Sequence, residues 1–162
     1  KSYCMTGWRG GYAAGPLNVI NAINKVQSQN VSSTASISMA ASVEALNGDQ
    51  SFIKSNNESF LRRRNLVVKN LNETPGISCR IPEGAFYVFA SCQGVLGKTT
   101  ESGKTLQSDG DFMDYLLEDV GVAGVQGSAF GLDGYFRISY ATSDSVLEDA
   151  CQRIKKACDK LS

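Results

Sequence analysis

The chain has 162 residues, of which 42% are hydrophobic, and its 16 basic side chains balance 16 acidic ones. That length and composition suit one ordinary domain, or two small lobes, with a buried core rather than a disordered chain. A formal net charge of zero lacks the basic excess that binding to nucleic acid or to an acidic membrane surface demands. No run of about 20 apolar residues is present, so we expect no membrane span and a soluble protein.

The sequence contains no histidine and five cysteines. Without histidine, Ser-His-Asp and Cys-His catalysis are excluded within this chain, so any chemistry must use lysine, arginine, tyrosine, carboxylates or a bound cofactor. The cysteines show no CxxC spacing, and no histidine could complete a zinc site, so we expect no metal. Cys151 and Cys158 fall on the apolar side of a predicted helix, which favours reduced thiols and a cytoplasmic setting.

The first half of the chain predicts helices after a glycine-rich start. Residues 1–15 predict a loop that runs into a short strand at 12–14. Apolar spacing predicts a helix over 17–26, interrupted by a polar run at 27–33, and a well-buried helix over 34–46. Asp49 is placed to cap a helix of about 25 residues, and because so long a helix often joins two lobes, we expect separate units at 1–60 and 61–162.

The second half predicts a mixture of strands and helices. Residues 85–90 and 135–140 read as strands, because β-branched and aromatic residues dominate them. Between them, Ser108 and Asp111 resemble a capping box that opens a helix. A last amphipathic helix includes Leu147, Cys151 and Cys158, and we expect Ser145 and Glu148 to form the capping box at its start. The order helix, strand, helix, strand, helix predicts an α/β or α+β sandwich.

The start of the chain, KSYCMTGWRGGYAAGP, carries the densest functional pattern. Lys1 and Arg9 lie on a glycine-supported loop. This suits a carbonyl cofactor bearing a phosphate, because a lysine amine forms imines and a guanidinium clamps phosphate oxygens. On composition alone, a solvated lysine and an inert arginine are the better interpretation. A nucleotide-binding loop is a weaker alternative, because the segment neither follows a strand nor fits the G-x-G-x-x-G spacing.

Three ordered blocks change that balance. The string KSY-x-MTGWR-x-GYAAGP closely resembles the pyridoxal phosphate attachment signature of class I aminotransferases, and PEGAFYVF and FRISYATS resemble two later blocks of that family. The likeness covers essentially the whole chain and is strongest to the bacterial aspartate aminotransferase-like group. It implies the C-terminal part of the fold type I transferase fold. Residues 1–60 would be the end of the large cofactor-binding domain with the start of the interdomain helix, and 61–162 the small α/β domain.

The resemblance implies roles for individual residues. Lys1 would bond covalently to pyridoxal phosphate and move the substrate Cα proton, while Arg9 would hold the cofactor phosphate. Arg137 would bind the substrate α-carboxylate, and the alternative is a structural ion pair with an acid on a neighbouring element. Gly127 and Phe130 resemble residues near the active-site mouth, although core packing explains Phe130 equally well.

The implied activity moves an amino group from an amino acid such as aspartate to a 2-oxo acid such as 2-oxoglutarate. The resemblance further implies a homodimer with small-molecule substrates. The charge and the cysteines have already indicated a cytoplasmic protein with no nucleic-acid or membrane partner. In this family the attachment lysine lies past the middle of the polypeptide, so we expect the chain to be a C-terminal portion that is inactive alone. The alternative is a catalytically incomplete module that serves folding or dimerisation, or that needs a separately made N-terminal half.

Overall fold

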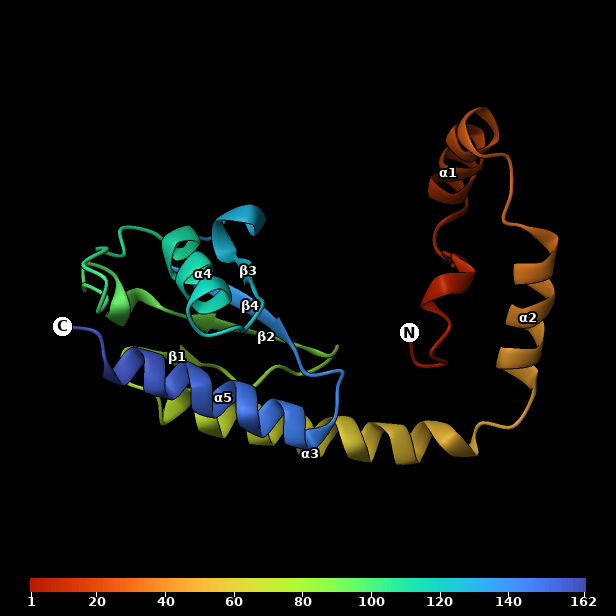
Figure 1. The fold of residues 1–162 in the computed structure, drawn as a ribbon. Coiled ribbons are helices and arrows are strands. Elements are labelled where there is room, and N and C mark those ends of the chain that lie inside the picture. Colours follow the sequence, from red (N-terminus) through yellow and green to blue (C-terminus); the bar gives the residue numbers. More distant parts are fainter. The chain divides into compact units, whose positions relative to one another are not determined.

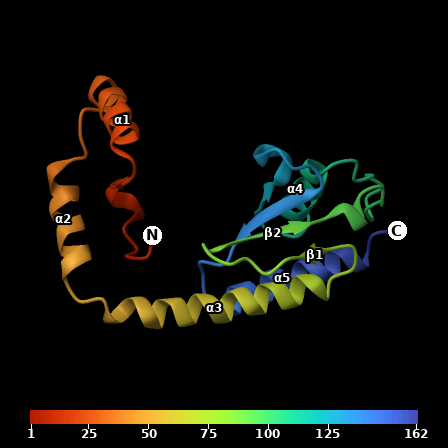
Figure 2. The ribbon, with the colours of Figure 1, turned by 180° about the vertical axis from the view of Figure 1, so that it is seen from behind.

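The structure, a computed structural model, describes every residue from Lys1 to Ser162. The chain forms two compact units, Lys1–Asn57 and Glu58–Ser162. The division falls inside one helix, α3 (Ser51–Asn72), which is the long helix expected from the sequence. Figure 1 shows the elements in chain order by colour, and Figure 2 shows them from behind. None of the helices has the length and apolar character needed to cross a membrane.

The first unit consists of helices joined by loops. It contains the 3-10 turn η1 (Thr6–Trp8), helix α1 (Leu17–Asn30), helix α2 (Ser36–Asn47) and the beginning of α3. The break predicted at residue 27 is wrong, because α1 continues through the polar run to Asn30. The strand predicted at 12–14 is also wrong, because the sheet of this chain pairs only strands from the second unit.

Hydrogen bonds fasten the glycine-rich start to the helices of the first unit. The Ser38 hydroxyl on α2 donates to the Trp8 carbonyl at 2.8 Å. The Tyr3 hydroxyl donates to the Gln50 side-chain oxygen at 3.0 Å, and the Tyr3 ring meets Phe52 edge-on with 6.3 Å between centroids. The segment that carries Lys1 and Arg9 is therefore held on α2 and on the start of α3.

Helices α1 and α2 bury almost none of their apolar side chains. Ser38 is the only fully buried residue of the two helices, so the expectation of a well-buried helix over 34–46 is wrong. The spacing of apolar residues predicted where these helices form. Whether those residues are buried depends on whether another surface covers them. Apolar areas this extended typically mark interaction surfaces. The exposed side chains are Leu17, Val19, Ile23, Val26, Ile37, Met39, Val43 and Leu46.

A four-stranded antiparallel sheet organises the second unit, with strand order β1-β2-β4-β3. The two strands predicted from the sequence are confirmed, with slightly different ends, as β2 (Tyr87–Ser91) and β4 (Tyr135–Ser139). Two strands of two residues each, β1 (Ser78–Cys79) and β3 (Val125–Gln126), were not predicted, because so short a strand offers no alternation to detect.

The sheet has one buried face and one partly open face. Val88, Ala90 and Phe136 point to the buried face, where they join a single core cluster with side chains of α3, α4 and α5. Phe112 of α4 meets Phe136 edge-on, with ring centroids 5.5 Å apart. Tyr87, Phe89, Tyr135 and Arg137 alternate with those residues and lie on the open face. The result is a two-layer α/β sandwich, as the sequence predicts.

Side-chain caps mark the N-terminal ends of α4 and α5, the two helices that follow β2 in the chain. Helix α4 (Asp109–Glu118) begins with the predicted capping box, in which Ser108 and Asp111 each accept a backbone amide of the other. Helix α5 (Asp144–Asp159) is capped by Ser143 and not by Ser145, so that prediction is wrong by two residues. Both serines can accept from an amide three residues on, and the sequence alone does not decide between them.

Four cysteines lie in the core of the second unit as free thiols. Cys151 and Cys158 are buried on α5, which confirms their predicted place on its apolar face. Burial raises the pKa of the Cys151 thiol to about 11 and that of Cys158 to about 12. They therefore pack as small hydrophobic side chains and not as reactive groups.

An ion-pair cluster joins α3 to the start of α5, and both views show these helices side by side (Figures 1 and 2). The Asp144 carboxylate accepts from the Nε of Arg62 at 2.7 Å and from the Nε of Arg63 at 3.0 Å. These hydrogen bonds, that of Arg62 first, lower the pKa of Asp144 from 3.8 to about 2. Arg62 and Arg63 of α3 thus tie that helix to α5.

We expect Asp144→Asn to destabilise the second unit more at pH 6 than at pH 2.5. A carboxyl group whose pKa is depressed on folding stabilises the protein above its unfolded pKa of 3.8, and this contribution is lost as the pH falls towards 2. The measurement is the urea midpoint of unfolding at pH 6 and pH 2.5, with exposed Asp133→Asn as the control. An equal difference from the unaltered chain at both pH values would contradict the expectation.

Candidate functional site

The loop around Lys1 and Arg9 is a sequence of tight turns. The Cys4 amide donates to the Lys1 carbonyl at 2.9 Å, and η1 follows directly. Arg9 ends η1 with a φ of 54°, in the left-handed region that few residues other than glycine adopt. Such a conformation costs on the order of 1–3 kcal/mol and concentrates at functional sites. Arg9 is thus held in one conformation at the end of the turn.

The donors on this loop fit a cofactor that carries both an aldehyde and a phosphate. Lys1 supplies a primary amine, and both Lys1 and Arg9 are exposed. The Arg9 guanidinium uses its Nη1 group to donate to the Thr6 carbonyl at 3.1 Å. A guanidinium has five N–H donors, so most of those on Arg9 stay available for an anion. The residue types at this loop therefore match the chemistry of pyridoxal phosphate.

Arg137 occupies the centre of β4, where it pairs with Phe89 of β2 and Val125 of β3. Its guanidinium carbon lies 4.4 Å from the centroid of the Tyr87 ring and 4.3 Å from that of Phe130. Both distances are well inside the range of cation–π attraction. Two aromatic rings thus hold the guanidinium over the open face of the sheet.

The ion pair considered as an alternative for Arg137 is not found. None of the six ion pairs of the chain involves this residue, and no oxygen of the chain accepts a hydrogen bond from its guanidinium. Arg137 is nevertheless partly buried. A partly buried cation whose N–H donors lack an acceptor is well suited to bind a carboxylate from outside the chain.

Phe130 belongs to an aromatic group on the open face and not to the core. Its side chain is 48% exposed. Phe89 meets Phe130 edge-on with 6.0 Å between ring centroids, and Phe89 stacks on Tyr135 with 5.6 Å between centroids. The interpretation of Phe130 as a core residue is therefore wrong. Aromatic side chains surround Arg137 and limit how it can move.

Sequence reasoning did not single out Tyr87, the second ring against Arg137. The sequence pattern that could have identified Tyr87 is the alternation of side chains between the two faces of each strand. If strands 85–90 and 135–140 are antiparallel neighbours, Tyr87 and Phe89 share the face of Arg137, because side chains alternate with a period of two. The pairing of Phe89 with Arg137 establishes this register. Pairing and register could not be read from the sequence.

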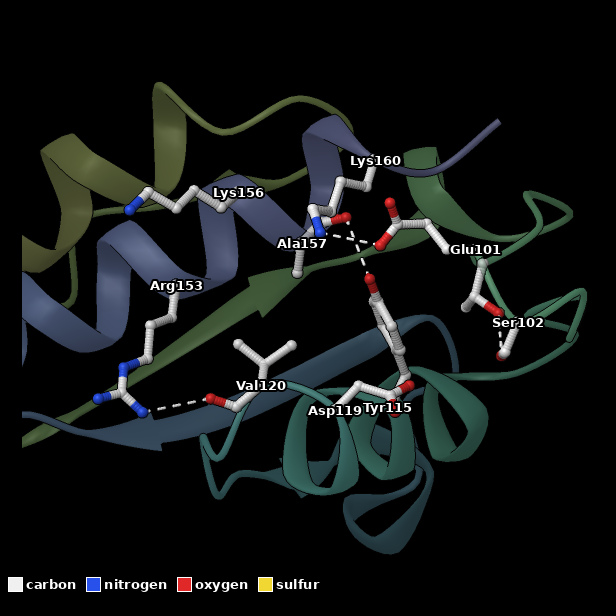
Figure 3. A pocket seen from close by; sticks show the side chains of 10 residues that line it. Glu101, Ser102, Tyr115, Asp119, Val120, Arg153, Lys156, Ala157 and Lys160 are labelled. Atoms are coloured by element: carbon white, nitrogen blue, oxygen red, sulfur yellow. Dashed lines mark hydrogen bonds and ion pairs between the residues drawn. The ribbon is translucent and has the colours of Figure 1, made fainter.

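A cavity of about 600 Å³ lies on the helical side of the second unit and is separate from the Arg137 face. Figure 3 shows α4 and α5 lining it from two sides. Lys160 pairs with Glu101 at 2.8 Å, and Arg153 pairs with Asp149 at 2.8 Å. Two of its cations therefore already have partners within the chain, so we do not place the candidate site there.

The predicted site residues are divided between the two units. Lys1 and Arg9 lie on the same loop of the first unit, and Arg137 lies in the second. The structure brings Arg137 together with Tyr87 and Phe130.

The family model for aminotransferase class I and II matches residues 1–154. The chain belongs to this aminotransferase family. Among curated relatives, the aspartate aminotransferase of Rhizobium meliloti (strain 1021) is 60% identical over 162 residues, which are 100% of this chain and 40% of that protein. The probable aspartate/prephenate aminotransferase of Rhizobium leguminosarum bv. phaseoli is 56% identical over 158 residues, 98% of this chain and 40% of that protein.

Solved structures of aminotransferases share the fold. The crystal structure of the Rhizobium meliloti aspartate aminotransferase matches 100% of this chain and 40% of that one, with a TM-score of 0.91 and 60% identity. Aspartate aminotransferase from Thermus thermophilus with maleate matches 97% of this chain and 39% of that one, with a TM-score of 0.83 and 34% identity. The chain thus spans 40% of the length of these aminotransferases, and the matched region is their C-terminal part. The expected fold, the C-terminal part of fold type I, is confirmed.

Proposed function

We propose that this chain belongs to an aminotransferase that moves an amino group from an amino acid, aspartate first, to a 2-oxo acid such as 2-oxoglutarate. The observation that carries the proposal is the Arg137 guanidinium, held between Tyr87 and Phe130 with no acceptor in the chain. Amino acids and 2-oxo acids share one feature next to the reacting carbon, an α-carboxylate. A planar guanidinium binds a carboxylate through two parallel hydrogen bonds and so fixes its orientation.

Lys1 and Arg9 are the residues that we propose would bind the cofactor, pyridoxal phosphate. Pyridoxal phosphate, when bound, supplies an aldehyde that accepts the amino group and a ring that withdraws electrons from the substrate Cα. The Lys1 amine would hold this group covalently and move the proton at the substrate Cα. Arg9 would bind its phosphate oxygens through the donors that Thr6 leaves available. Arg137 would orient the substrate by its carboxylate.

We propose further that residues 1–60 end a large cofactor-binding domain and begin the interdomain helix, while 61–162 form a small domain. The exposed apolar side chains of α1 and α2 support an assembly in which a homodimer and the rest of a large domain cover them. The free, buried thiols of the second unit support a reducing, cytoplasmic setting.

A second proposal concerns the chain by itself, which we expect to be catalytically incomplete. It spans 40% of the Rhizobium meliloti aspartate aminotransferase, and its two site halves lie in different units. The chain would then act only in folding or dimerisation, or it would need a separately made N-terminal half.

A chimera tests both proposals. The chain replaces the matching region of the Rhizobium meliloti aspartate aminotransferase, a substitution that 60% identity and full coverage make practical. We expect the chimera to convert aspartate and 2-oxoglutarate to oxaloacetate and glutamate, and the 162-residue chain alone to show no turnover. A folded chimera that binds pyridoxal phosphate but transfers no amino group from aspartate would contradict the first proposal. Turnover by the isolated chain would contradict the second.

A further inference from the structure

The turn that carries Phe130 is fixed to helix α4 by a buried carboxylate. This 3-10 turn, η3 (Gly127–Phe130), lies between β3 and β4. The Ser128 amide donates to Oδ2 of Asp109, the first residue of α4, at 2.7 Å. Asp109 is only 3% exposed. A charge-assisted hydrogen bond this short, shielded from water, is among the stronger single contacts available to a turn.

The Asp109 carboxylate remains charged although it is buried. Burial by itself would raise its pKa, but hydrogen bonds, above all that from the Ser128 backbone, outweigh burial and lower the pKa. A buried carboxylate without these donors would be costly, so its position and that of the turn depend on each other.

Asp109 is not needed to begin α4. The helix has a complete capping box in which Ser108 accepts from the Asp111 amide and Asp111 accepts from that of Ser108. Two orphan amides at this helix start are therefore satisfied without Asp109. Its carboxylate instead reaches 19 residues along the chain, to the turn.

The turn has little freedom once the Ser128 amide is held. Gly127 packs so closely on β4 that a Cβ there would lie 2.8 Å from the Tyr135 carbonyl oxygen. Gly131 closes the turn with a φ of 79°, and its amide donates to the Ser128 carbonyl at 3.0 Å. Phe130 lies between these two glycines, so its position follows from that of the turn. The ring of Phe130 contacts the Arg137 guanidinium from there.

We infer that Asp109 is a positioning residue, which sets Phe130 over the Arg137 guanidinium by holding the Ser128 amide. The inference rests on the proposed function, in which Arg137 binds the substrate carboxylate. Removing the Asp109 acceptor should release η3, let Phe130 move away from Arg137 and leave the arginine with only the Tyr87 ring. The substrate carboxylate should then bind more weakly, although Arg137 itself is unchanged.

The experiment observes the Arg137 side chain directly by NMR of the 162-residue chain. Protons above an aromatic face are shielded, so the Nε–Hε proton of Arg137, between two rings, should resonate upfield of those of the other six arginines. The signal is assigned by its loss in Arg137→Lys. Asp109→Asn keeps an oxygen acceptor and should keep the upfield shift. Asp109→Leu has a side chain of similar shape but no acceptor, and it should lose the part of the upfield shift that the Phe130 ring causes. Phe130→Leu should lose the same part.

Core signals of Val88 and Leu116 report whether each variant remains folded. An upfield shift as large in a folded Asp109→Leu chain as in the unaltered chain would overturn the inference. If Asp109→Leu does not fold, hydrogen exchange in the unaltered chain decides. Strong protection of the Ser128 amide is expected, and free exchange of that amide would overturn the inference equally.

Maleate titration of the same samples separates this inference from the proposed function. The shift without ligand depends on the positions of the two rings, Tyr87 and Phe130, whereas a change in the Arg137 signal on adding maleate depends on carboxylate binding. An upfield shift that requires Asp109, together with an Arg137 signal that maleate leaves unchanged, would support the positioning role and contradict the carboxylate role.

Discussion

Replacing Lys1 with alanine (K1A) in the chimera should abolish the adduct that borohydride reduction fixes between the protein and pyridoxal phosphate. Of the site residues in this chain, only Lys1 has a primary amine, which is the group that bonds covalently to an aldehyde. Within the chimera its α-nitrogen is in a peptide bond, so Nζ alone can react. We expect complete loss of the modified peptide by mass spectrometry, and loss of aspartate turnover with it.

Lys25→Ala provides the matched control, because Lys25 is another exposed lysine of the first unit. That variant should retain the full yield of modified Lys1 peptide. Circular dichroism should show that both variants keep their helices. An adduct of undiminished yield in folded K1A, on whichever lysine, would remove the basis for assigning Lys1 to the cofactor.

Replacing Arg137 with lysine should weaken binding of a dicarboxylate to the chimera by about tenfold to a hundredfold. Hydrogen bonds to charged groups contribute about 1.5–3 kcal/mol, and an ammonium cannot reproduce the two parallel bonds of a guanidinium. A lysine would also lose the flat stacking between Tyr87 and Phe130. The measurement is the dissociation constant of maleate, the compound named with the Thermus thermophilus structure.

Arg80→Lys is the control for this substitution, since Arg80 is an exposed arginine of the same unit with no ion pair. Its maleate affinity should equal that of the unaltered chimera. The Arg137 variant should keep its adduct with pyridoxal phosphate, because Lys1 is unchanged. Unaltered maleate affinity in the Arg137→Lys variant would show that the carboxylate binds elsewhere.

Periodicity and caps predicted the elements of this chain well where the signals are local. The capping box of Ser108 and Asp111 opens α4 as predicted, and Leu147, Cys151 and Ile154 lie on the buried side of α5. These features depend on residues within one or two helical turns of each other. A single sequence therefore contains the information that specifies them.

Features that depend on distant partners could not be predicted in this way. The alanine-rich composition of α2 suggests burial, yet its apolar side chains are exposed, because burial requires a surface that this unit does not provide. The contact between Asp109 and Ser128 joins residues that no motif connects. Tyr87 reaches Arg137 only through the pairing of β2 with β4. Resemblance to a family indicated Arg137 itself, but not the rings that hold it.

The two rings around Arg137 have a thermodynamic consequence. A free arginine side chain has about 2 kcal/mol of rotamer entropy to lose when it becomes ordered. Because Tyr87 and Phe130 already restrict this side chain in the folded chain, much of that loss occurs on folding and not on binding. A carboxylate therefore meets a guanidinium that is oriented in advance, and more of the contact energy appears as affinity.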